Sequence, residues 1–161
     1  MKTCRSCLTL IGAASFFCFA CGSEQTAPPP AEDPAEHACE HRSEPGTSLS
    51  AAADRAAAPV IAVNEEPYTV GLPSGAPGYL KISAPLAGLL FIGTADVVTG
   101  LFRNDETTSQ PLESSPNEFC ATEIPEHYDL DLDSGNLTLQ LGPSAVPEVW
   151  LALTLAGAHA H

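Results

Sequence analysis

From residue 59 onward, short apolar runs alternate with turn signals. The clearest pattern is HYDLDLDSGNLTLQLG (127–142), in which Tyr128 and two leucines alternate with aspartates, and three further leucines alternate with Thr138 and Gln140. A period of two residues is typical of a strand with one buried and one wet face. Ser134-Gly135 separates the two halves, so we predict a β-hairpin that turns there.

Similar runs recur along the rest of this region. They are PVIAV (59–63), YTVGL (68–72), GYLKISA (78–84), LLFIGTA (89–95), VVTGLFR (97–103) and PEVWLALTL (147–155). Pro- and Gly-containing breaks lie between most of them, and residues 104–118 form a polar loop. About eight short strands at this spacing predict an all-β fold, an antiparallel β-sandwich.

The N-terminal residues have a different pattern of charge and hydropathy. Lys2 and Arg5 precede LTLIGAASFFCFA (8–20), an uncharged apolar run of signal-peptide length that is too short for a comfortable membrane span. The run ends at CFAC (18–21), which resembles the lipobox of bacterial lipoproteins, although Leu is usual where Cys18 stands. The resemblance implies a signal peptide over residues 1–20 and acyl chains, including palmitate, on Cys21. The alternative is ordinary secretory cleavage nearby, with Cys21 free.

An acylated Cys21 would anchor the chain in the lipid bilayer without a spanning helix. Gly22 follows it, where Asp would signal retention at the inner membrane, so the outer membrane or cell surface of a Gram-negative bacterium is the expected address. Residues 21–36 are acidic and proline-rich and predict an extended linker. The folded domain is then expected over residues 37–161, beginning with the segment HACEH.

The charge of the chain is strongly one-sided. Six lysines and arginines face 20 aspartates and glutamates, which gives a formal net charge of −14. Nucleic acid is excluded as a partner on this ground, whereas cations are favoured. Solubility of a small exported domain is the favoured explanation of this acidity.

Only one pair of cysteines remains to be assigned in the expected mature domain. Cys4, Cys7 and Cys18 leave with the signal peptide and Cys21 is the lipidation site, so Cys39 and Cys120 remain. In an oxidising compartment a remaining pair indicates a disulfide.

The histidines lie near the cysteines or at the chain end. If HACEH is extended, His37, Cys39 and His41 share one face, and imidazole with thiolate suits zinc or copper. Three interpretations stay open: a Cys39–Cys120 disulfide with idle histidines, a histidine metal cluster, or a free-thiol zinc site on the two cysteines. The candidate metal ligands are His37, His41, His127, His159 and His161.

Other chemistry is poorly supported. The aspartates of DLDLDSGN (129–136) invite Ca²⁺, but a calcium loop needs Gly where Ser134 stands and Glu where Gln140 stands. An exposed strand face explains them, with loosely bound surface calcium as the alternative. Trp150, in an apolar run, is interpreted as core. Ser114 and Ser115 have no neighbouring base, and no hydrolase motif or phosphate loop is present, so no catalytic residue is assigned.

Three of these segments together resemble a known family. YTVGL, GYLKISAPLAGLLFIGT and HYDLDLDSGNLTLQLG, within residues 66–155, look like the bacterial pre-peptidase C-terminal domain, a small β-sandwich appended to secreted peptidases. The whole chain is also similar to small uncharacterised bacterial envelope lipoproteins. Neither resemblance implies a catalytic residue. The expected function is a non-enzymatic binding or structural module with an envelope protein or glycan partner, and the alternative is zinc or copper binding.

Overall fold

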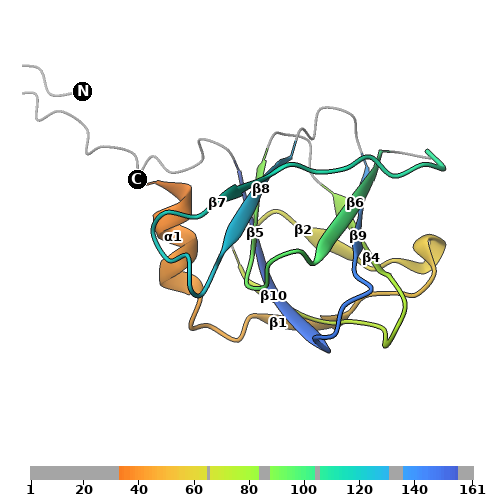
Figure 1. Cartoon of the computed structure of the whole chain (residues 1–161), viewed down its shortest axis with the longest axis horizontal. Coiled ribbons are helices and arrows are strands. Elements are labelled where there is room, and N and C mark those ends of the chain that lie inside the picture. Colours follow the sequence, from red (N-terminus) through yellow and green to blue (C-terminus); the bar gives the residue numbers. More distant parts are fainter. Residues whose placement is uncertain (1–32, 65, 84–87, 104–105, 131–135, 156–161) are drawn as a thin grey trace, which may run out of the picture.

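The computed structural model describes residues 33–64, 66–83, 88–103, 106–130 and 136–155. Its elements are α1 (Pro34–His41), β1 (Thr47–Ser50), the 3-10 helix η1 (Arg55–Ala57), β2 (Val60–Ala62), β3 (Tyr68–Gly71), β4 (Gly78–Ser83), β5 (Gly88–Ile92), β6 (Val98–Arg103), β7 (Ser114–Pro116), β8 (Glu126–Leu130), β9 (Leu137–Leu141) and β10 (Glu148–Leu155). The predicted all-β sandwich is confirmed (Figure 1).

The ten strands form two packed sheets. The six-stranded sheet has the order β1-β3-β10-β5-β8-β7, and the four-stranded sheet has the order β2-β4-β9-β6. The sheets are mixed, because β1 pairs with β3 and β2 with β4 in parallel, which corrects the purely antiparallel expectation. Strands β1 and β7 escaped prediction because they are short edge strands with little apolar alternation, held largely by backbone pairing.

The predicted hairpin is wrong. Strand β8 pairs with β5 and β7 in one sheet, whereas β9 pairs with β4 and β6 in the other. The predicted turn lies at residues 131–135, outside the described residues. The alternation had identified the inward side chains of both strands correctly, since Tyr128, Leu130, Leu139 and Leu141 are all buried. A period of two shows which side chains of a strand face the core, but it does not show which strand lies beside it. The chain can therefore cross from one sheet to the other between β8 and β9 and still bury the same residues.

The main core lies between the two sheets and contains a polar network around Tyr128. The Tyr128 hydroxyl donates to the Glu126 carboxylate over 2.6 Å, and the Asp96 backbone N–H donates to the same carboxylate oxygen over 3.0 Å. Both side chains are buried. Burial, and then the neighbouring Glu126 carboxylate, raise the pKa of Tyr128 well above the usual 10.0.

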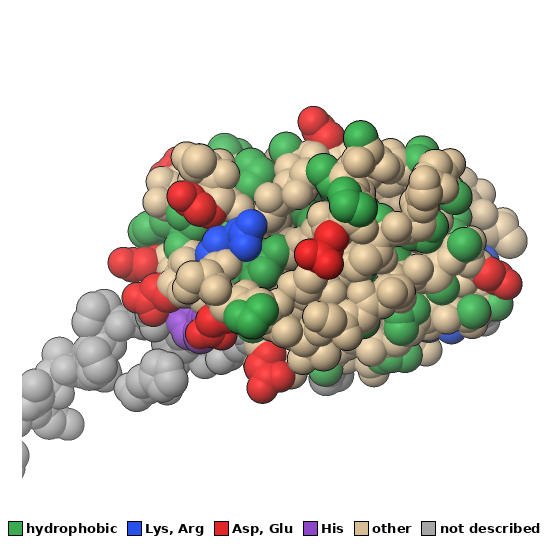
Figure 2. Space-filling view, turned by 90° about the horizontal axis from the view of Figure 1, so that it is seen from below, with side chains coloured by type: hydrophobic (Ala, Val, Ile, Leu, Met, Phe, Trp, Pro, Cys, Tyr) green, Lys and Arg blue, Asp and Glu red, His purple; other side chains and the backbone are tan. Residues whose placement is uncertain are grey.

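The outer face of the six-stranded sheet carries a second apolar layer. Phe91 of β5 and Trp150 and Ala152 of β10 are buried there beneath Ala38 of α1 and Ile124. Strands β5 and β10 are therefore apolar on both faces. Figure 1 shows α1 beside this sheet, and on the face drawn in Figure 2 acidic side chains are spread among polar and apolar ones.

The Tyr128 network predicts an alkaline limit to stability. Because the folded protein holds Tyr128 neutral, its contribution should be complete below pH 10 and should be lost as the pH rises above 10. Removing the hydroxyl in Tyr128→Phe should lower the free energy of unfolding by about 1–3 kcal/mol at pH 7, since Glu126 loses a buried donor. Urea unfolding at pH 7 and pH 11 measures both. If Tyr128→Phe loses as much stability between pH 7 and pH 11 as the wild-type protein does, the loss comes from groups other than Tyr128.

Candidate functional site

The residues at the start of α1 determine where the helix begins. Asp33 caps it, with its carboxylate accepting from the Ala35 N–H over 2.9 Å, and Pro34 occupies the first turn. The helix begins inside the predicted linker and includes all of HACEH. The extended conformation considered for that segment is therefore wrong, because the capping signals before it start a helix.

The helix buries its apolar side against the sheet. Ala38 packs with Phe91 and Trp150, and Trp150 is only 6% exposed, which confirms its interpretation as core. The Arg42 guanidinium lies 5.2 Å from the centroid of the Trp150 ring. Its Nε–H donates to the Glu123 carbonyl over 3.1 Å. These contacts hold the Arg42 side chain against the sheet at the C-terminal end of α1.

A disulfide between Cys39 and Cys120 joins the middle of α1 to the loop before β8. This confirms the predicted pair and rules out a zinc site on free thiols. Buried Asn117 braces the same loop, because its amide oxygen accepts from the Phe119 N–H over 2.9 Å. The Asn117 amide nitrogen lies 3.7 Å from the Cys120 sulfur.

His37 and His41 come together through the helix. Four residues apart, they share one side of α1, and their ring centroids are 4.6 Å apart. His41 Nδ1 lies 2.9 Å from the Glu44 carboxylate. The pair is thus the part of the predicted histidine cluster that the structure brings together.

The remaining described candidate, His127, does not form a metal-holding group with this pair. His127 lies on β8, with its ring 5.5 Å from that of Phe91. Within the described part of the chain, no three histidine, cysteine or acidic side chains are placed to hold a metal ion. His159 and His161 lie outside the described residues, as do Cys21 and most of the aspartate strip considered for calcium.

A groove of about 360 Å³ opens at the N-terminal flank of α1. Its floor includes Leu89 and Phe91 from β5, and Phe119 lies at its edge, 52% exposed. It is lined by Asp33, Ala35, Leu89, Phe91, Ser115, Pro116, Asn117, Glu118, Phe119 and His127. One signal of this groove in the sequence was missed, namely a Phe directly before a paired Cys in a polar loop.

Ser115 and His127 are cross-strand partners in this groove. The sequence-based statement that Ser115 has no neighbouring base is therefore wrong, because strand pairing places an imidazole opposite it. A histidine base in a hydrolytic triad is oriented by a third group on its other nitrogen. His127 Nδ1 is buried and has no hydrogen-bond partner among the described residues. The pair therefore lacks this orienting contact.

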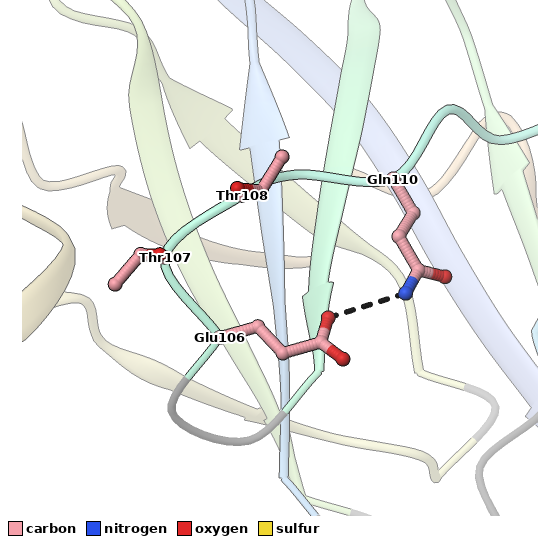
Figure 3. Close-up of a pocket in the computed structure, with 4 residues that line it drawn as sticks. All are labelled: Glu106, Thr107, Thr108 and Gln110. Atoms are coloured by element: carbon pink, nitrogen blue, oxygen red, sulfur yellow. Dashed lines mark hydrogen bonds between the residues drawn. The ribbon is translucent and has the colours of Figure 1, made fainter.

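The larger cavity, of about 500 Å³, lies elsewhere, against the polar loop of Glu106, Thr107, Thr108 and Gln110 (Figure 3). The side chains of Glu106 and Gln110 point toward each other, and the amide donates to the carboxylate over 3.2 Å. The four side chains include no imidazole and no thiol. We therefore place the candidate site at the groove beside α1.

Comparison with known proteins found no family model and no curated protein that matches the chain. Among the residues that the structure describes, no helix has the length and apolar character needed to cross a membrane.

The bridge predicts a large stability change on reduction. Cys39 and Cys120 are 81 residues apart, and closing such a loop contributes about 4–5 kcal/mol in the chain-entropy model. Urea unfolding of Cys39→Ala/Cys120→Ala should show a loss of this order in the free energy of unfolding. The double variant should be indifferent to added thiol, whereas the native protein should lose stability with it. Equal stability of variant and native protein would contradict the bridge's role.

Proposed function

We propose that the chain is an exported, lipid-anchored, non-enzymatic module of the bacterial cell envelope that binds a partner through the groove beside α1. The observation that carries the proposal is the groove itself, framed by a helix and a loop that the Cys39–Cys120 bridge joins. Preformed apolar concavities with a few polar groups are the usual form of binding sites.

The disulfide supports export, because such bonds persist in oxidising compartments. The signal-like run at residues 8–20 and the lipobox-like CFAC support acylation of Cys21. The linker that follows would hold the groove away from the bilayer while keeping it tethered.

The polar groups near the groove support binding over catalysis. The Glu126 carboxylate already accepts two hydrogen bonds in the core, and His127 lacks an orienting partner in the described residues. Ser115 and His127 are then polar contacts for a ligand, a role that needs neither an activated hydroxyl nor a general base.

A second candidate function is zinc or copper binding, which the His37–His41 pair favours. Histidines four residues apart on a helix suit one metal ion, and a carboxylate on the other ring nitrogen is a common orienting arrangement. Glu44 beside His41 Nδ1 would leave Nε2 as the ligand atom. Further ligands would have to come from elsewhere, and His159 and His161 are candidates.

Site-specific photocrosslinking in the exporting cell tests the binding proposal. A benzophenone amino acid at Ser115, in the groove, should crosslink to one defined envelope component, because bound partner atoms would lie within reach. The same amino acid at Thr107, in the remote loop, is the matched control and should give no such product. Cys21→Ser should abolish palmitate incorporation and release the chain from the membrane fraction. Equal crosslinking from both positions, or no product from Ser115, would contradict the proposal.

Native mass spectrometry of the untagged protein tests metal binding. One zinc or copper ion should be retained by the native protein and lost by His37→Ala/His41→Ala, because two ligands disappear. His127→Ala is the control and should keep the ion, since His127 lies on β8 whereas both proposed ligands lie on α1. Micromolar binding that survives the double change would eliminate this site.

A further inference from the structure

Phe119 is an exposed aromatic side chain at a preformed groove. Among the described residues, only Val60 and Phe119 are large hydrophobic side chains that remain exposed, at 63% and 52%. Val60 stands alone on the edge strand β2, and scattered exposure of that kind is ordinary. Phe119 differs because it lines the groove together with half-buried Leu89, and Phe91 is buried behind them.

The loop that carries Phe119 is held in place on both sides. Its own N–H donates to the amide oxygen of buried Asn117, and the next residue, Cys120, is bonded to α1. Beyond the bridge, the N–H groups of Glu123 and Ile124 both donate to the Cys120 carbonyl. A residue ordered in this way loses little conformational entropy on binding, which is a property of interface anchor residues.

The charged groups of the groove are all acidic. Asp33 and Glu118 line it, and Asp129 lies opposite Leu89 on the same face of the sheet. No lysine or arginine is among its described lining residues. A positively charged partner is therefore electrostatically complementary to the groove.

Other occupants fit the groove less well. A second copy of the chain would bring another net charge of −14 against the acidic rim. Residues 1–20 are the proposed signal peptide, and the other flanking segments, 22–32 and 156–161, contain neither a lysine or arginine nor a large apolar side chain.

We propose that the groove binds a cationic polypeptide segment, with a large apolar side chain against Leu89 and Phe119 and lysines or arginines beside Asp33 and Glu118. This inference rests on the proposed binding function and names the class of its partner. Phe119 would act as the anchor of the interface, and the two acids would select the charge of the segment.

Fluorescence anisotropy with labelled peptides tests the proposal. The untagged protein is purified from an exporting cell and held in phosphatidylcholine nanodiscs, with empty nanodiscs as the blank. The peptide KKLFALKK should bind saturably, whereas EELFALEE, with the same apolar centre and reversed charge, should bind at least about tenfold more weakly. KKSGSGKK, which keeps the lysines without the apolar side chains, should also bind at least about tenfold more weakly.

Matched variants locate the binding. Phe119→Ala should weaken KKLFALKK by about tenfold or more, whereas Val60→Ala removes the other exposed side chain and should change nothing. Asp33→Asn/Glu118→Gln should weaken binding and reduce its salt dependence, and Asn retains the helix cap. Glu66→Gln/Glu106→Gln removes two acids outside the groove and is the control for charge.

Each result is decisive. Equal binding of the two charged peptides, no effect of Phe119→Ala, or no binding of any peptide would overturn the cationic-segment proposal. If EELFALEE binds and Phe119→Ala abolishes that binding, the groove remains a binding site and only the partner class is wrong. Crosslinking from Ser115 tests whether the groove binds any envelope component, and it does so independently of these peptides.

Discussion

The covalent bond between Cys39 and Cys120 is the constraint on which the outer face of the six-stranded sheet depends. It fixes α1 over Phe91 and Trp150, and it fixes the loop of Asn117 and Phe119 beside the helix. An eight-residue helix has little stability of its own in water. Its place on the sheet therefore relies on the bridge together with the burial of Ala38.

The helix explains why two strands are apolar on both sides. In β10, every residue from Val149 to Thr154 is buried, and β5 likewise buries Phe91 between Leu90 and Ile92. A sandwich strand with one wet face would alternate apolar and polar residues, so a continuous apolar run indicates that something covers the second face. The continuous apolar run PEVWLALTL therefore indicated that another layer covers the outer face of this strand. That layer is α1, which lies far from β10 in the sequence.

The sequence predicted the class of the fold and the faces of its strands, because burial imposes a local period on each strand. It did not predict which strands are neighbours, so β8 and β9 were paired wrongly. The helix was missed although Asp33 and Pro34 are ordinary start signals, because the surrounding prolines and acids favoured a linker. The pairing of Cys39 with Cys120 followed from counting, whereas the groove joins residues from four separate segments and has no local pattern.

The two flanks of α1 differ in a way that favours the groove as the binding side. At the C-terminal flank, Arg42 covers the Trp150 ring and bonds to the Glu123 carbonyl, so the aromatic surface is already shielded by a cation of the chain itself. At the N-terminal flank, the exposed ring of Phe119 lies among acids, without a cation of the chain among the described lining residues. A basic partner at this flank would supply the kind of group that Arg42 supplies at the other. An aromatic ring and a cation would then lie together on both sides of the helix, within the fold at one flank and through binding at the other.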